Sequence, residues 1–237
     1  RETLSLAKRS FRCISMDTLV ASDFDGNSTT STSGSGRSLI EHTTASGFGG
    51  VDAFISHSWQ DPGPAKYEQL VSWGDEARRG GVAEPRVWLD KACIKQDQTD
   101  EEKQADINSL PVFLSGCRSL VVLAGPTYTS RLWCVVELFV WLRVGGARER
   151  IKVAPLAHQA QLGGGGEAHT LFASFDAAKA KCFKAKDRQH LLGVIESGFG
   201  DLVPFNKVVR GLLATEPSSR AVRPEDLDNA DLPAQSI

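Results

Sequence analysis

The sequence lacks any apolar run of the ~18 residues that a membrane-spanning helix requires. Its longest apolar run, WCVVELFVWL, is shorter and is interrupted by Glu137. The N-terminal stretch, RETLSLAKRSFRC, also lacks the apolar core of a signal peptide. We therefore expect no membrane segment here. Because the sequence begins with Arg rather than Met, we expect it to be part of a longer polypeptide.

Cysteine pairs of the kind found in zinc sites are lacking as well. The five cysteines include no CxxC pair, and their odd number argues against a disulfide framework. The five histidines are dispersed along the chain. We therefore expect reduced thiols in a cytoplasmic protein, with no bound metal and no resident cofactor.

An excess of charge of one sign is also absent. The formal net charge is −2, and Lys and Arg are scattered rather than clustered. This excludes the basic patch typical of nucleic-acid-binding proteins. Hydrophobic residues make up 41% of the 237 residues, which is enough for a sizeable core in one α/β domain with appendages.

Composition divides the chain into four parts. We interpret residues 1–20 as a fragment of a preceding region. Residues 21–50 contain the tract GNSTTSTSGSG, which is too poor in apolar side chains to offset its ordering entropy, and are interpreted as a flexible linker. Residues 51–214 form the predicted domain, and residues 215–237 are predicted to be a disordered tail.

The predicted domain alternates apolar strands with helical segments. This alternation predicts right-handed crossovers and an open parallel sheet with helices on both faces, a three-layer α/β fold. Pro111 is expected to break or kink the second helix near Leu110. The predicted strands are 51–56, 86–90, 119–125 and 151–157, with a short candidate at 170–175; the predicted helices are 64–79, 102–116, 130–144, 176–196 and 203–214.

In open parallel sheets, ligands bind at the carboxyl ends of the strands, near the point where the strand order reverses. The residues that directly follow the first three predicted strands are therefore the candidate binding residues. They are Ser56, His57, Ser58 and Trp59 after the first strand, Asp90 and Lys91 after the second, and Gly125, Pro126 and Thr127 after the third.

Glu137 lies in the middle of a helix that is apolar on almost every face. Its neighbours one turn away are Trp133, Cys134, Val140 and Trp141, so no cation on the helix pairs with it. A buried carboxylate is costly unless something compensates it. Either Glu137 reaches a loop cation or a backbone N–H in a structural role, or it belongs to a functional site.

Three motifs in order resemble those of the Toll/interleukin-1 receptor (TIR) domain family. DAFISHSWQD resembles the family's opening strand, and VWLDKACI resembles its second strand and the loop that follows. LVVLAGPTYTSRLWCVVEL resembles the third strand and the helix after it. In this last motif six positions agree with the family in type and spacing: Tyr128, Ser130, Trp133, Cys134, Glu137 and Leu138.

The resemblance implies a flavodoxin-like sheet of strand order 2-1-3-4-5 and a role in immune or stress signalling by self-association with other TIR domains. A subset of the family cleaves NAD+, and its catalytic glutamate corresponds to Glu137. One carboxylate suits this reaction, because nicotinamide leaves as a neutral group from an oxocarbenium-like transition state and needs no general acid. Trp133 and Trp59 would then stack against the substrate.

Three functions therefore remain open. The first is an NAD+ glycohydrolase with Glu137 as the catalytic residue. The second is a non-catalytic TIR module that signals by self-association. The third is a flavodoxin-like nucleotide-binding domain of unrelated chemistry, since a fold alone does not fix a function.

Overall fold

The structure is a computed structural model of the whole chain. It describes residues 7, 9–24, 38–95, 99–156, 172–182 and 185–212.

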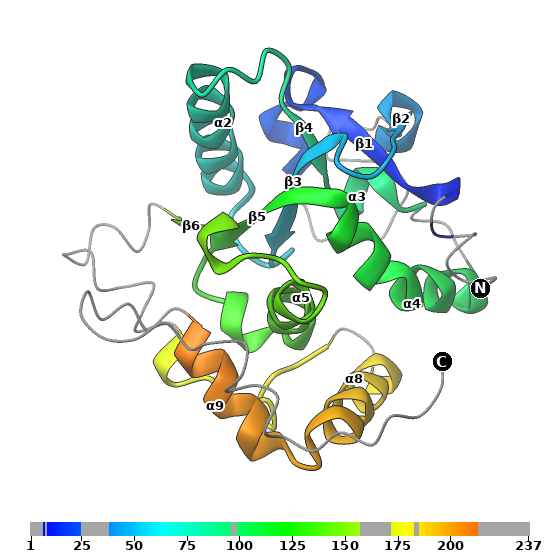
Figure 1. Cartoon of the computed structure of the whole chain (residues 1–237), viewed down its shortest axis with the longest axis vertical. Helices are drawn as coiled ribbons and strands as arrows, with labels where there is room; N and C mark the ends of the chain where they lie inside the picture. The colour runs from blue at the N-terminus through cyan, green and yellow to red at the C-terminus, as the bar shows by residue number, and fades with distance from the viewer. Residues whose placement is uncertain are drawn as a thin grey trace.

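Four adjacent parallel strands form the larger part of one six-stranded sheet (Figure 1). They are buried, apolar segments, and all four lie within three residues of where the sequence predicts them. Their spatial order β4-β3-β5-β6 is the predicted order of the first four strands, 2-1-3-4. The bounds are β3 (Val51–His57), β4 (Arg86–Trp88), β5 (Cys117–Ala124) and β6 (Ile151–Pro155).

Helices connect these strands and cover both faces of the sheet. Figure 1 shows α2 on one face, and α4 and α5 on the other. Phe113 of α4 stacks on Trp88, which in turn stacks on Phe54 with ring centroids 4.4 Å apart, so aromatic packing fixes α4 to the sheet. The connecting elements are α2 (Gly63–Arg79), α3 (Asp90–Cys93), α4 (Asp100–Gly116), η4 (Tyr128–Ser130), α5 (Leu132–Arg143) and η5 (Arg148–Arg150).

Helix α4 begins with a capping box formed by Thr99 and Glu102 and runs through Pro111 to Gly116. The predicted break near Leu110 is therefore wrong. Pro111 lacks the N–H that an inner turn of a helix uses. Tertiary packing offsets that loss, because Leu110 and Phe113 on either side of it are buried in the core.

Two antiparallel strands extend the sheet beyond β4. Strand β1 (Arg12–Ser15) pairs with β4, and β2 (Thr44–Ala45) pairs with β1. The 3-10 helices η1 (Met16–Thr18), η2 (Ala21–Phe24) and η3 (Leu39–His42) lie between them in sequence. The sheet is therefore mixed, and the prediction of an all-parallel sheet is wrong. Sequence placed these residues in a preceding fragment and a linker; residues 25–37, which hold GNSTTSTSGSG, lie outside the described residues.

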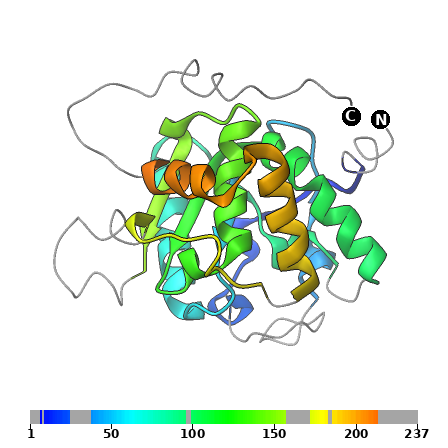
Figure 2. The ribbon, with the colours of Figure 1, turned by 90° about the horizontal axis from the view of Figure 1, so that it is seen from below.

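Two C-terminal helices cover α5 on the side away from the sheet, as Figure 2 shows from below. Phe139 of α5 packs edge-to-face against Phe199 and Phe205, which joins the three helices through aromatic contacts. The helices are α8 (Ala185–Phe199), which begins nine residues later than predicted, and α9 (Leu202–Leu212). The candidate strand at 170–175 is wrong for its described part, since residues 172–173 are helical. The predicted tail, 215–237, lies outside the described residues.

Candidate functional site

The carboxyl ends of β3, β4 and β5 meet at one edge of the sheet, because the three strands are parallel. Strand β3 brings Ser56 and His57 to this edge. Asp90 arrives there as the first residue of α3, and Thr127 follows β5. The residues that follow these strands therefore lie along one edge of the sheet. We call this region the carboxyl edge.

Glu137 faces inward from α5 toward β3. The Ser56 hydroxyl donates to its Oε2 at 2.6 Å and lies 2.7 Å from the Tyr128 hydroxyl. Tyr128 in turn donates to the backbone carbonyl of Cys134 at 3.0 Å. Ser56 and Tyr128 are fully buried, and the Glu137 residue as a whole retains some exposure. The predicted orphan carboxylate therefore has partners, and they are hydroxyls rather than a cation.

This network favours a protonated carboxyl group. Burial raises the pKa of Glu137 to about 8, although the hydrogen bond from Ser56 opposes the shift. The geometry leads to the same conclusion. The hydroxyls of Ser56 and Tyr128 have two protons between them, whereas the network contains three hydrogen bonds, each of which needs a proton. A proton on Glu137 supplies the third: the protonated carboxyl donates to Ser56, Ser56 then donates to Tyr128 instead of to Oε2, and Tyr128 donates to the carbonyl of Cys134.

Asp90 organises a second cluster at the carboxyl edge. Its Oδ1 lies 3.1 Å from His57 Nε2, and its Oδ2 accepts a hydrogen bond from Trp59 Nε1 at 2.7 Å. Burial alone would raise the pKa of Asp90, but the adjacent His57 and the hydrogen bonds that the carboxylate accepts outweigh it and hold the pKa below its usual range. Asp90 therefore remains ionised and fixes the orientation of the Trp59 ring.

The two clusters lie on opposite sides of β3. Successive side chains of a strand point to opposite faces, so Ser56 is directed toward α5 and His57 toward the face covered by α2. The hydrogen bonds follow this division, because Ser56 bonds to Glu137 whereas His57 bonds to Asp90. Sequence proximity suggested one site, and the structure separates it into two groups of residues.

A third contact network joins the loop after β3 to the loop after β5. Ser58 Oγ lies 2.7 Å from Thr127 Oγ1, and Asp61 Oδ1 accepts hydrogen bonds from the amide and hydroxyl of Thr127. The Asp61 carboxylate lies directly against Gly125, where a Cβ atom would meet it at 2.3 Å. Gly125 is therefore needed for this close approach.

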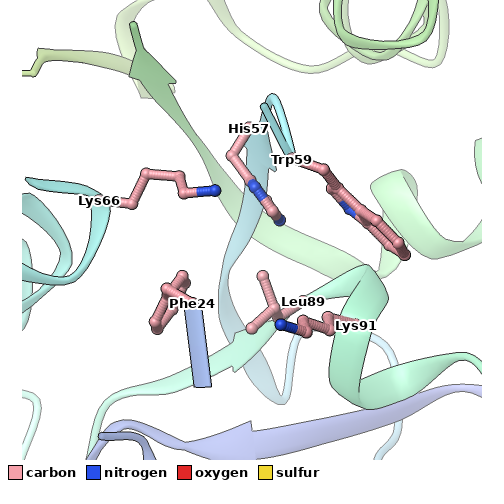
Figure 3. Close-up of a pocket in the computed structure, with 6 residues that line it drawn as sticks. All are labelled: Phe24, His57, Trp59, Lys66, Leu89 and Lys91. Atoms are coloured by element: carbon pink, nitrogen blue, oxygen red, sulfur yellow. The ribbon is translucent and has the colours of Figure 1, made fainter. Parts of the chain in front are cut away.

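A pocket opens on the α2 side of the carboxyl edge, as Figure 3 shows. We call it the lysine pocket; its lining residues are Phe24, His57, Trp59, Lys66, Leu89 and Lys91. Both lysines are buried. Lys66 Nζ donates to the carbonyl of Ser58 at 3.1 Å, and Lys91 Nζ donates to the carbonyl of Asp23 at 2.7 Å. Burial lowers the pKa of Lys66 to about 8, against the attraction of Asp61 and Asp90.

Of the predicted site residues, His57, Trp59 and Lys91 line the lysine pocket, and Asp90 and Ser58 contact residues of its wall. Ser56 belongs instead to the Glu137 network. Trp133 is not brought to either group: it is partly buried against the core, and the pocket lining does not include it.

Sequence reasoning missed Phe24, Asp61, Lys66 and Leu89. Lys66 could have been identified from the sequence, because it lies four residues before Leu70 on the buried stripe of α2, where a lysine is unusual. Phe24 could not. It reaches the pocket from η2, a segment that composition assigned to a linker.

The described cysteines are free thiols, and Cys93 is almost fully enclosed. Burial raises the pKa of Cys93 to about 12, so it remains an unreactive thiol. Across the described ranges, no three His, Cys, Asp or Glu side chains are grouped to hold a metal ion. Nor is any described helix both long and apolar enough to cross a membrane.

Comparisons with protein-family models, with curated proteins and with solved structures found no match to this chain.

Proposed function

We propose that the chain is a TIR-like domain of flavodoxin-like architecture that cleaves the nicotinamide–ribose bond of NAD+, with Glu137 as the catalytic carboxylate. The observation that carries the proposal is Glu137 itself. It is a carboxyl group with a raised pKa, held by Ser56 beside the carboxyl end of a parallel strand. Groups with strongly shifted pKa values gather at functional sites more often than elsewhere.

The reaction suits a single carboxylate. The C1′–N1 bond breaks, and its electron pair neutralises the positive nicotinamide ring, which leaves without a proton. Water then forms the new C1′–O bond, giving ADP-ribose, nicotinamide and a proton. Ionised Glu137 would stabilise the positive charge that develops on the ribose in between. The Ser56 hydroxyl holds the carboxylate by a hydrogen bond, and the Tyr128 hydroxyl in turn bonds to Ser56.

The proposal requires the site to open. The lysine pocket encloses only about 10 Å³, far less than the ~300–1,000 Å³ typical of small-molecule sites. Glu137 is turned toward Ser56 and does not line it. A bound dinucleotide therefore needs Glu137 to turn toward the carboxyl edge, where Trp59 is held by Asp90 in a fixed orientation.

The internal hydrogen bond of Glu137 also suits a structural role, and the second candidate is therefore a non-catalytic TIR module that acts by self-association in intracellular signalling. In that case Glu137 is a structural carboxyl group that links α5 to β3 through Ser56. The two candidates make opposite demands on Glu137: catalysis needs it ionised, and the structural role needs it protonated.

Nicotinamide release from NAD+ by the full chain and by Glu137→Gln tests the proposal. We expect Glu137→Gln to lose about 10²–10³ in turnover, the usual cost of removing one transition-state contact. NAD+ affinity should change much less, since such a contact acts mainly on kcat. A wild type that releases no nicotinamide at high protein concentration would leave the signalling module as the better account. Equal turnover of the two proteins would remove Glu137 from the mechanism.

A further inference from the structure

The wall of the lysine pocket carries positive charge and little negative charge. Lys66 and Lys91 both present their ammonium groups from buried positions, and Figure 3 shows Lys66 directed toward His57. The nearby carboxylates are not part of the wall. Asp90 is engaged by His57 and Trp59, and Asp61 Oδ1 by Thr127, whereas Asp61 Oδ2 is buried without a hydrogen-bond partner among the described residues.

Lys66 has less compensation than a buried ammonium group usually receives. It is 1% exposed and makes one hydrogen bond, to the carbonyl of Ser58, although an ammonium group has three N–H donors. Within the described residues, no carboxylate oxygen lies within 4.0 Å of its Nζ. Buried charges in proteins are normally paired. The ammonium group of Lys66 therefore has N–H donors left to bind an anion.

His57 supplies a second, independent observation. Its side chain is 3% exposed, and its Nδ1 is buried with no hydrogen-bond partner among the described residues. Buried polar atoms of this kind are uncommon, and they usually mark a place that a water molecule or a ligand completes. The same ring lines the lysine pocket beside Lys66.

We propose that the lysine pocket is a binding site for a small oxyanion, in chemical terms a phosphate group, with Lys66 as its principal charge partner. Lys91 and His57 flank that position, and the ring of Trp59 forms a wall. In this structure the enclosed space of about 10 Å³ holds one water molecule, so a phosphate group enters the pocket only if the side chains of its wall move apart. The site goes beyond NAD+ cleavage, since neither Glu137 nor Ser56 lines it.

Titration calorimetry of the full chain with inorganic phosphate tests the site. Lys66→Met keeps the length of the side chain and removes its charge. Lys207→Met removes the same charge from an exposed lysine of α9 and is the matched control. We expect Lys66→Met to weaken phosphate binding by about tenfold or more, as the loss of a charge-assisted hydrogen bond does, and Lys207→Met to bind like the wild type.

Thermal unfolding separates binding from a structural role. Phosphate should raise the Tm of the wild type and of Lys207→Met but not that of Lys66→Met. In the absence of phosphate, Lys66→Met should unfold at the wild-type Tm or above it, because it removes a buried charge. If Lys66→Met fails to fold, Lys66→Gln replaces it, since its amide still donates to the carbonyl of Ser58.

Phosphate can come from two sources, and competition with NAD+ distinguishes them. If NAD+ displaces phosphate, the pocket holds a phosphate of the dinucleotide; if the two bind independently, it holds a separate phosphate ligand. Either result supports the site. No heat and no Tm shift with millimolar phosphate in the wild type would overturn it, as would unchanged binding in Lys66→Met or an equal loss in Lys207→Met. Failure here leaves the turnover test of Glu137 unaffected.

Discussion

At the scale of single residues, the two protonation states of the buried Glu137 carboxyl group suit two different roles. Its protonated form completes a chain of three hydrogen bonds through Ser56 and Tyr128. Its ionised form is the one that would stabilise a positive transition state. The pKa of about 8 places the change between these forms near neutral pH.

This pKa predicts how the stability of the fold depends on pH. The pKa of Glu137 rises from 4.5, the ordinary value of a glutamate side chain, to about 8 in the folded chain. The folded state therefore holds a proton that the unfolded state releases. Stability from this group is complete below pH 4.5 and is lost as pH rises to 8, with a total effect of a few kcal/mol.

Glu137→Gln removes this titration and keeps a donor toward Ser56. We expect the free energy of unfolding of Glu137→Gln to match that of the wild type near pH 5 and to exceed it increasingly up to pH 8. Urea unfolding at several pH values measures the difference. Glu196→Gln, an exposed position on α8, is the control and should show no such divergence. A Glu137→Gln protein that is less stable than the wild type at pH 8 would contradict the buried, protonated assignment.

At the scale of secondary-structure elements, strand β1 is the part that the sequence predicted least well. Its pairing with β4 aligns Ile14 with Val87, and Ile14 is fully buried. Four residues with a polar side chain at each end, RCIS, give too short a pattern to separate a strand from a helix. The pairing partner lies about 70 residues away in sequence, and a local sequence pattern does not indicate so distant a partner.

If β1 is part of the folded domain, Ile14→Ala should destabilise the protein by about 2–5 kcal/mol, the usual cost of truncating a buried isoleucine. Val203→Ala on α9, where the side chain is 69% exposed, should change stability by less than ~0.5 kcal/mol. Chemical unfolding of both variants measures this. Equal stabilities would mean that residues 12–15 belong to a separate region, as their composition suggests.

At the scale of the whole molecule, sequence analysis predicts the central β/α alternation and the edge at which candidate residues meet. The strands could be predicted because they are continuous apolar runs such as VDAFIS and SLVVLA, and the helices because they end at glycines or strands. The division of the site into two clusters could not be predicted from the sequence, because it depends on which side of β3 each residue faces. The lysine pocket could not either, because Phe24 reaches it from the distant η2 segment.

The central claim, that Glu137 is a catalytic carboxylate, is tested most directly by the pH dependence of nicotinamide release. Because catalysis needs the ionised form, kcat/KM of the wild type should rise with pH and level off above about 8, the pKa of Glu137 in the free protein. Glu137→Gln should stay low across the same range. A wild-type rate that is independent of pH between about 6 and 9, on either side of that pKa, or a Glu137→Gln rate equal to it, would contradict the claim.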